Sequence, residues 1–292
     1  MDARPNWIVK SHALGNDYLV MDPSALTFAL TPDAVRRICH RHMGAGSDGI
    51  LVLVPSSRAD FGLRIFNPDG SEAEKSGNGL RIFAKFLYDH GYTKEPAFSI
   101  ETPGGIAHVR LHLAGGRIDQ MTLDVGRATF HSRDIPVAGA PREVVDEDLV
   151  AGGIQLKITA VSVGNPHCVV FVPDLRDVDF YRLGPLLETH AAFPRRTNVQ
   201  FAQVIARDHL RIMIWERGAG ETMASGTSAS AVAAASVRRG LTDRMMTISA
   251  PGGDLRITVG EDWSIRMTGP ASEVYTGTLS ADLVAALGSP PP

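Results

Sequence analysis

The chain has 292 residues, of which 44% are hydrophobic and 21% are charged, and its formal net charge is −3. This composition excludes a disordered protein, and the 29 basic and 32 acidic residues form no long run of the kind that nucleic-acid binding favours. No apolar stretch approaches the roughly 20 residues of a membrane span, and the first residues lack the pattern of a secretory signal. We therefore expect a cytoplasmic protein that acts on a small molecule, with no nucleic-acid or membrane partner. The length indicates two domains.

Helices and strands alternate through the first half of the chain. The apolar positions of 34–40 share one helix face, 50–54 and 63–66 have the apolar runs of strands, and 80–88 has helical spacing. A Pro-Gly-Gly sequence at 103–105 predicts a hairpin turn between two further strands.

The second half follows the same order. Residues 169–172 and 209–215 are strand-like, and the Ala-rich segment 228–239 predicts a helix that Gly240 stops. Pro251-Gly-Gly again predicts a hairpin turn. The order of elements therefore suggests an internal duplication.

Individual residues support the duplication. An offset of 149 positions carries Asn16 onto Asn165 and Ser76-Gly77 onto Ser225-Gly226. The same offset relates Glu72 to Glu221, Asn67 to Glu216 and Gly49 to Asn198. We interpret the chain as a duplicated α/β (α+β) unit, because unrelated loops would scatter these offsets.

The duplication sets the expected domain boundaries. We predict a first domain over residues 1–126 and a second over 127–270. Residues 271–292 are expected to return to the first domain through a strand at 273–277. The Gly-Ser-Pro-Pro-Pro tail, 288–292, is expected to be a frayed end.

The two cysteines give no sign of a disulfide. Cys39 and Cys168 are too far apart in the sequence to form a Cys-x-x-Cys motif, and two thiols are no disulfide framework. Cys39 falls on the apolar face of a predicted helix and Cys168 precedes the apolar run 169–172. We expect both to be reduced, buried and inert.

The repeated Ser-Gly turns are the first candidate site. Each stands at the start of a predicted helix, where backbone N–H groups and the positive end of the helix dipole favour an anion such as a carboxylate. The alternative is purely structural: Ser76 and Ser225 cap their helices and the glycines relax the turns. Because the turn occurs twice, we favour the functional interpretation.

A set of polar side chains lies in the Gly-rich loops near these turns. Amides and a guanidinium can bind the ammonium and carboxylate groups of an amino acid without a metal, although single asparagines also cap turns. The set consists of Asn16, Asn67, Asn165, Asn198, Glu216 and Arg217. His167 is either an ordinary loop histidine or an orienting residue beside the site, and the sequence leaves both open.

Metal and cofactor motifs are weak or missing. His40-x-His42 has no acidic or cysteine partner at ligand spacing, and no dinucleotide or phosphate-loop motif follows a predicted strand. We expect neither a metal nor a cofactor.

The sequence resembles the diaminopimelate epimerases over nearly its whole length. The matching segments are HALGNDY at 12–18, RHMGAGSDG at 41–49, FNPDGSE at 66–72, GNGLR at 77–81, GNPH at 164–167, TN at 197–198, ERGAGET at 216–222 and MTGP at 267–270. The resemblance implies two pseudo-symmetric domains, each a curved sheet around a central helix, with the substrate in a cleft between them. It also implies a cofactor-independent isomerase that interconverts LL- and meso-2,6-diaminopimelate by two-base proton transfer, in lysine and peptidoglycan biosynthesis. A homodimer is left open.

The resemblance also implies roles for individual residues. Ser76 and Ser225 stand at the positions of the family's two catalytic cysteines, and His167 and Glu216 would support that acid–base pair. The implied substrate-binding residues are Asn16, Gly49, Asn67, Gly77, Asn78, Asn165, Asn198, Glu216, Arg217, Gly226 and Thr227.

Both acid–base positions depart from the family pattern. A thiol with a pKa of about 8.5 can form a thiolate near neutral pH, whereas a serine hydroxyl is a much weaker acid. Three interpretations stay open. The first is an inactive form that still holds substrate, which we favour because the binding motifs are intact. The second is an isomerase or lyase that acts on another amino acid through serine, and the third is a catalytically silent amino-acid-binding protein. Lys75 and Ser228 are smaller departures, the second at a place where glycine is expected.

Overall fold

The computed structural model describes residues 4–287, which form two compact units. Among these residues, unit 1 contains 4–123 and 270–287, and unit 2 is Asp124–Gly269. The chain changes unit after Leu123 and again after Gly269, whereas the sequence analysis placed these boundaries after 126 and 270. The tail at 288–292 lies outside the described residues. Within 4–287, no helix is both long enough and apolar enough to cross a membrane.

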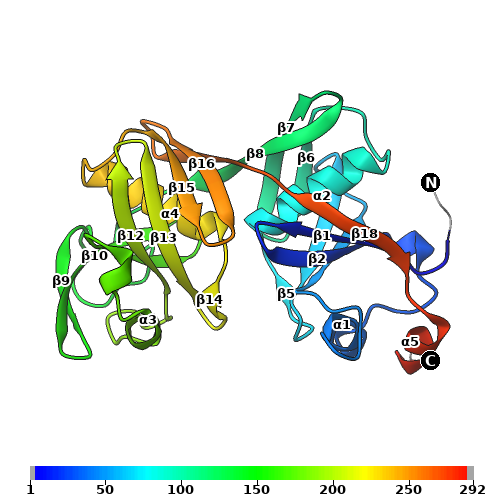
Figure 1. The fold of residues 1–292 in the computed structure, drawn as a ribbon, viewed down its shortest axis with the longest axis horizontal. Coiled ribbons are helices and arrows are strands. Elements are labelled where there is room, and N and C mark those ends of the chain that lie inside the picture. The colour runs from blue at the N-terminus through cyan, green and yellow to red at the C-terminus, as the bar shows by residue number, and fades with distance from the viewer. Residues whose placement is uncertain (1–3, 288–292) are drawn as a thin grey trace. The chain divides into compact units, whose positions relative to one another are not determined.

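Unit 1 is a strongly curved sheet with helices at its faces (Figure 1). Its strands are β1 (Trp7–Ala13), β2 (Asn16–Met21), β3 (Ile50–Val54), β4 (Phe61–Phe66), β5 (Glu72–Ala73), β6 (Ala97–Thr102), β7 (Gly105–Ala114), β8 (Arg117–Arg127), which continues into unit 2, and β18 (Ser272–Thr278). Its helices are η1 (Pro23–Ala25), α1 (Pro32–Cys39), α2 (Gly77–Asp89) and α5 (Ala281–Ala286). Neighbouring strands pair antiparallel, except that β2 runs parallel to β3 and β4 parallel to β6.

Unit 2 repeats this arrangement. Its strands are β9 (Glu147–Ala151), β10 (Ile154–Ser162), β11 (Pro166–Phe171), β12 (Asn198–Ala206), β13 (His209–Glu216), β14 (Gly220–Thr222), β15 (Met245–Ala250), β16 (Gly253–Val259) and β17 (Ser264–Gly269). Its helices are η2 (Leu175–Asp177), α3 (Phe180–Glu188) and α4 (Gly226–Arg238). The pairing is again antiparallel except for β11 with β12 and β13 with β15.

The duplication read from the sequence is thus present in the strand order of the two units. In each unit a hairpin leads through a short helix, α1 or α3, into a parallel strand. A second hairpin then leads through a longer helix, α2 or α4, into another parallel strand. Parallel neighbours need a crossover connection, and the helices supply it. The Pro-Gly-Gly turns join β6 to β7 and β15 to β16, as predicted.

The predicted elements agree with the structure in kind and differ at their ends. The helix predicted over 80–88 begins three residues earlier, at Gly77, because Ser76 caps it. The strand predicted over 169–172 begins at Pro166 and ends before Val172, because Pro166 already faces Ser162 in the ladder with β10. Proline is tolerated there as the first residue of a strand. The strand at 273–277 is part of β18, which pairs with β1 in unit 1 as expected.

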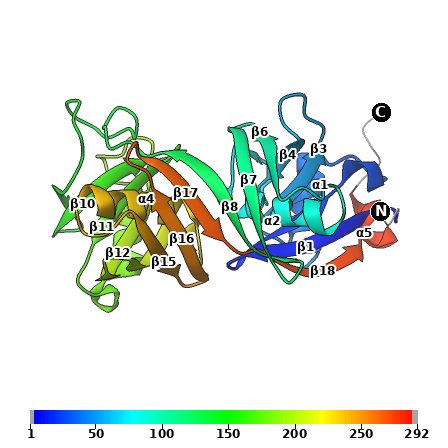
Figure 2. The same ribbon diagram turned by 90° about the horizontal axis from the view of Figure 1, so that it is seen from above.

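The longer helix of each unit is packed against several strands. α2 contacts β1, β2, β7 and β18, and α4 contacts β10, β11, β12, β15, β16 and β17 (Figure 2). α4 is buried on nearly all sides, which its alanines and serines permit because small side chains let strands approach closely. The structure therefore shows a curved sheet around a central helix in each unit.

The shorter helices cover the outer side of each sheet. In unit 1, Val35, Ile38 and Cys39 of α1 pack with strand residues such as Leu19 and Ile50. In unit 2, α3 buries Phe180, Leu183 and Leu187 in an apolar cluster that includes Cys168 and Phe201. Both cysteines are free and buried, as predicted.

Candidate active site

Ser76 and Ser225 cap the two central helices in the same backbone conformation. Ser76 has φ −140° and ψ 120°, and its Oγ accepts a hydrogen bond from the backbone N–H of Gly79 at 3.0 Å. Ser225 has φ −143° and ψ 123°, and its Oγ accepts from the N–H of Ser228 at 3.4 Å. Both serines are therefore true N-caps. This structural role is compatible with a functional one, because the hydroxyl proton of each serine is not used by the cap.

The two hydroxyls differ in their neighbours. The phenol oxygen of Tyr18 lies 3.5 Å from Oγ of Ser76, so one hydroxyl meets another. Oγ of Ser225 lies 3.3 Å from Oγ1 of Thr227 and is hydrogen-bonded to the carboxyl group of Glu216. Only the unit 2 serine has an acidic side chain as its partner in this way. The two serines therefore share one backbone conformation, but their hydroxyl groups have different neighbours.

Glu216, at the end of β13, is the ionisable neighbour of Ser225. Desolvation by burial raises the pKa of its carboxyl group, and the hydrogen bond from Ser225 opposes the shift only in part. A carboxyl group with a raised pKa can hold or release a proton closer to neutral pH. The raised pKa thus makes the Glu216 carboxyl group chemically able to exchange a proton beside Ser225.

In unit 1 the predicted asparagines form a hydrogen-bonded chain beside Ser76. Nδ2 of Asn78 donates to Oδ1 of Asn16 at 3.1 Å, and Nδ2 of Asn16 donates to Oδ2 of Asp48 at 3.0 Å. Nη2 of Arg81 donates to Oδ1 of Asn78 at 2.8 Å. The structure therefore brings Asn16 and Asn78 together with Ser76-Gly77 at the start of α2.

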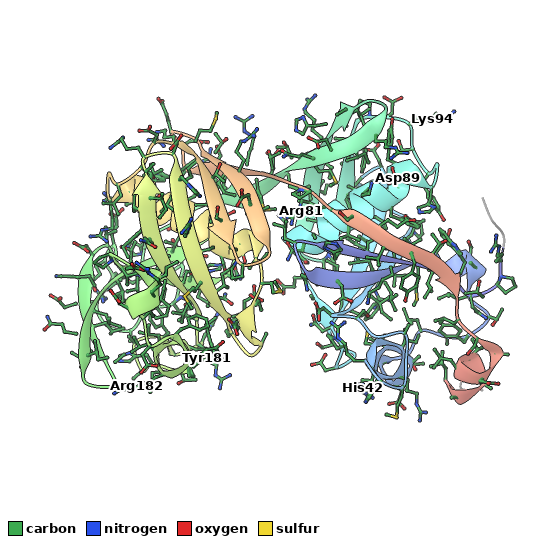
Figure 3. The ribbon with its side chains drawn as sticks, in the orientation of Figure 1. His42, Arg81, Asp89, Lys94, Tyr181 and Arg182 are labelled. Atoms are coloured by element: carbon green, nitrogen blue, oxygen red, sulfur yellow. The ribbon has the colours of Figure 1, made fainter. Side chains whose placement is uncertain are left out.

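Arg81, labelled in Figure 3, stabilises this series of hydrogen bonds. Its guanidinium is fully buried and donates to the backbone oxygens of Gly77 and Pro270 at 3.2 and 3.1 Å. Burial lowers the pKa of Arg81 to about 10, which still leaves the group charged at neutral pH. A charged group bound to Gly77 and Asn78 fixes the first turn of α2.

Asp48 is a member of this network that the sequence analysis did not single out. It accepts from Asn16, from the backbone N–H of Asp17 at 3.1 Å, and from the guanidinium of Arg41 at 2.6 Å. Arg41 also binds Asp17 at 2.6 Å. Asp48 lies inside the 41–49 motif, but its partner Asn16 is 32 positions away, so spacing alone did not reveal the contact.

Gly49 makes room rather than offering a functional group. A Cβ at this position would lie 2.4 Å from the carbonyl oxygen of Phe66 and 2.7 Å from Cε1 of Tyr18. Only glycine lets the Tyr18 ring take this position. Asn67 lies in the turn that follows β4. Its Nδ2 donates to Oγ of Ser71 at 3.0 Å, and its backbone N–H donates to the carbonyl oxygen of Ser71 at 2.8 Å.

In unit 2 the structure brings Asn198 and Arg217 together. Oδ1 of Asn198 accepts from the backbone N–H of Arg217 at 2.9 Å, and Nδ2 donates to the carbonyl oxygen of Pro166 at 2.9 Å. Asn198 thus ties the Glu216-Arg217 turn to the start of β11. The Arg217 guanidinium donates to the carbonyl oxygen of Arg195 at 3.2 Å.

A pocket of about 210 Å³ lies at this turn. Asn165, Arg195 and Arg217 line it with hydrogen-bond donors, and Asp134 supplies one carboxylate. Guanidinium and amide N–H groups that point to one space favour an anionic group such as a carboxylate. The lining of this pocket therefore has the donor groups that a carboxylate requires.

His167 is no loop histidine, and that alternative is wrong. It is the second residue of β11, is completely buried, and its Nε2 lies 2.9 Å from Oδ1 of Asn165. Burial lowers the pKa of His167 to about 3, so the ring is neutral at physiological pH. A neutral, buried ring beside Asn165 has the chemistry of an orienting group rather than that of a free base.

Glu188, at the end of α3, is a further residue that the sequence did not reveal. Its side chain is buried and accepts hydrogen bonds from Nε1 of Trp215 at 2.8 Å and from the N–H of Gly218 at 2.9 Å. Nη1 of Arg196 donates a third hydrogen bond to Oε1 of Glu188 at 3.2 Å. Glu188 therefore stabilises the turn that carries Glu216 and Arg217.

Residues 4–287 contain no group of three or more His, Cys, Asp or Glu side chains placed to hold a metal ion. The His40 ring accepts the backbone N–H groups of His42 and Met43 at 3.2 and 3.1 Å, which accounts for its position at the end of α1.

Comparison with known proteins decides the family. The model of the family "Diaminopimelate epimerase" matches residues 8–131 and 159–274, which include all the segments described above. The chain belongs to the diaminopimelate epimerase family. The resemblance seen in the sequence is thereby confirmed, and the chain is an isomerase of the diaminopimelate epimerase type.

Curated relatives agree over nearly full length. "Diaminopimelate epimerase 2" of a Nostoc species is 48% identical over 277 residues, covering 94% of this chain and 96% of the relative. The diaminopimelate epimerase of Pelotomaculum thermopropionicum is 46% identical over 270 residues, covering 92% and 96%.

Solved structures support the fold assignment. A hydroxyproline epimerase from Agrobacterium vitis has a TM-score of 0.69 at 17% identity, covering 93% of this chain and 90% of that one. A predicted epimerase from Pseudomonas aeruginosa has a TM-score of 0.68 at 18% identity, covering 94% and 99%. The diaminopimelate epimerase-like fold expected from the sequence is confirmed.

Proposed function

We propose that this member of the diaminopimelate epimerase family binds LL- and meso-2,6-diaminopimelate and interconverts them only very slowly. The reaction is a two-base proton transfer at the α-carbon, without a cofactor, with Ser76 and Ser225 at the two acid–base positions. The observation that carries the proposal is that these two serines have one cap geometry while the binding motifs around them are complete. A hydroxyl is far harder to deprotonate than a thiol, so the rate falls although the scaffold is retained.

The residual reaction runs most easily through Glu216. When ionised, its carboxylate accepts the Ser225 proton, and it is the strongest base next to either serine. On the Ser76 side, Oγ already accepts the Gly79 N–H, and the Tyr18 hydroxyl can act as a second donor. This leaves the Ser76 proton free to serve as a hydrogen-bond donor to substrate.

The remaining site residues bind the polar groups of the amino acid. In unit 2, Arg217 and Asn165 offer donors to a carboxylate at the pocket they line. In unit 1, the N–H groups of Gly77 and Asn78 at the start of α2 offer donors to a second carboxylate. Asn16, Asn67, Asn198, Gly226 and Thr227 complete the proposed binding set, in which Gly49 acts by making room for Tyr18.

The decisive experiment measures α-proton exchange of LL-diaminopimelate in D₂O. The chain is compared with Ser76→Cys, Ser225→Cys and the double variant, and calorimetry measures binding of both stereoisomers by each protein. We expect binding by all four proteins, slow exchange by the unmodified chain, and fast exchange with epimerisation only in the double variant.

Two other outcomes would contradict the proposed function. Binding without exchange even in the double cysteine variant means that the chain is a silent amino-acid-binding protein. Absence of binding to either stereoisomer removes diaminopimelate as the ligand, and other amino acids are then screened for exchange as substrates of a serine-based isomerase.

A further inference from the structure

Two buried acceptor atoms next to the candidate site lack a donor. They are Nδ1 of His167 and Oε1 of Gln200, and neither has a hydrogen-bond partner within the part of the chain that the structure describes. Both residues are completely buried, on adjacent parallel strands β11 and β12. An unpaired buried polar atom is costly, so native proteins almost always satisfy such groups.

The hydrogen bonds around the His167 ring limit how Nδ1 can be satisfied. Nε2 lies 2.9 Å from Oδ1 of Asn165, an oxygen that can only accept, so the ring proton belongs on Nε2. A neutral imidazole carries one N–H, and Nδ1 is then an acceptor. The neighbouring side chain that can supply a donor is the Gln200 amide. With its Nε2 directed to Ser228, its oxygen faces the ring, where it can only accept and so raises the pKa of His167.

Ser228 supplies the missing partner on the other side of Gln200. Its Oγ lies 2.9 Å from Nε2 of Gln200, and a hydroxyl can accept or donate. A half-turn of the amide places Nε2 toward Nδ1 of His167 and Oε1 toward the Ser228 hydroxyl. All three groups are then satisfied at once. The serine at 228, where glycine was expected, would then supply the hydrogen-bond donor for the Gln200 amide oxygen.

We propose that Gln200, anchored by the Ser228 hydroxyl, donates to Nδ1 of His167 and locks the ring in its Nε2–H tautomer. The Nε2–H group then donates to Oδ1 of Asn165 and fixes the orientation of that amide. The Asn165 NH₂ group is left for the pocket beside Arg217, where it favours a carboxylate. Gln200 and Ser228 are thus positioning residues for a binding side chain. This last consequence for ligand binding rests on the proposed function, whereas the tautomer does not.

The tautomer can be measured directly. A long-range ¹H–¹⁵N correlation spectrum of the uniformly ¹⁵N-labelled chain reports the protonated nitrogen of each of the ten histidines. The His167 signals are assigned by their disappearance in His167→Gln. We expect a neutral ring protonated at Nε2 at pH 7. A ring protonated at Nδ1, or at both nitrogens, overturns the proposal without any variant.

Variants test the anchor. In Ser228→Ala the amide oxygen loses its donor and can turn back toward His167, so an Nδ1–H form is expected to appear. Gln200→Glu, which offers only acceptors, is expected to protonate Nδ1 as well. Ser230→Ala is the matched control, because that hydroxyl lies on the same helix and donates to Gly226 within it at 2.7 Å. An unchanged tautomer in both test variants overturns the proposal.

Ligand affinity separates the two hypotheses. If diaminopimelate binds, its affinity is expected to fall about tenfold in Ser228→Ala, the equivalent of losing one hydrogen bond, and to stay unchanged in Ser230→Ala. Unaltered affinity in Ser228→Ala despite a changed tautomer overturns the consequence for Asn165. If no protein binds diaminopimelate, the proposed function fails while the spectra still decide the tautomer.

Discussion

The carboxyl group of Glu216 shares a hydrogen bond with the hydroxyl of Ser225 at the N-terminus of α4. The corresponding hydroxyl in unit 1, Ser76, faces the phenol of Tyr18 instead. Position 67, which the repeat relates to 216, is an asparagine whose amide bonds within its own turn. Of the two matched serines, the one in unit 2 therefore has an acidic neighbour and the one in unit 1 has a phenol, and the first prediction depends on this difference.

Replacing Glu216 should slow the residual proton exchange strongly. In Glu216→Gln the rate of α-proton exchange is expected to fall about a hundredfold, because the carboxylate that accepts the Ser225 proton is gone. In the unmodified chain the ionised form is the base, so the rate should rise with pH through the raised pKa of Glu216. Deuterium incorporation followed by NMR across pH checks both.

The matched control for this prediction is Glu221→Gln. Glu221 is exposed on β14 and accepts from the Tyr181 hydroxyl at 2.9 Å, away from Ser225. Equal rates in the two glutamine variants, or an exchange rate that falls as pH rises, would contradict the role of Glu216.

Any side chain at position 49 should destabilise unit 1. Gly49→Ala places a Cβ 2.4 Å from the carbonyl oxygen of Phe66 and 2.7 Å from the Tyr18 ring, and the expected loss is about 2 kcal/mol of unfolding free energy. Gly91→Ala is the control, since its φ is +76° but no atom lies within 4 Å. That variant should lose only the backbone strain, about 1 kcal/mol. Urea unfolding measures both, and equal losses would refute the steric argument.

The Glu188 carboxylate should hold the binding turn in place. Glu188→Ala leaves the indole of Trp215 and the N–H of Gly218 without an acceptor, so we expect a loss of about 3 kcal/mol in unfolding free energy. Affinity for diaminopimelate should fall as well, because Glu216 and Arg217 lie in the same turn. Glu188→Gln keeps one acceptor oxygen and should lose less on both measures. The expectation fails if the two variants unfold at the same urea concentration.

The two cysteine thiols should be unreactive in the folded chain. Cys168 is completely buried, which raises the pKa of its thiol to about 12, and Cys39 is buried with its thiol pKa also raised. A thiol reagent should therefore label no cysteine in native protein at pH 8 and two after unfolding. Rapid labelling of either cysteine in native protein would show that one of them is accessible.

Local patterns in the sequence predicted much of this fold. The apolar spacing of 80–88 and 228–239 predicted the two central helices, and the Ser-Gly pairs marked their starts within a few residues. The common offset of Ser76 and Ser225 predicted the duplication that appears in the strand order. These features are short-range or repeated, so the sequence shows them directly.

The contacts that were missed join residues far apart in the sequence. Glu188 and Gly218 are 30 positions apart, Gln200 and Ser228 are 28 apart, and Asn16 reaches Asp48 across 32. Periodicity reveals which face of an element is buried, but it does not reveal which polar groups meet there. The sequence therefore indicated the binding residues, whereas the residues that position them required the structure.

The pairing of β18 with β1 affects how the chain is made. Strand β1 of unit 1 is synthesised before unit 2, and its partner β18 follows only after all of unit 2 has been synthesised. Until then β1 keeps one unpaired edge, which is a template for pairing with other chains. Unit 2 is continuous in sequence and can complete its sheet first. Premature termination before residue 272 should therefore yield a chain with one finished half and one that tends to aggregate.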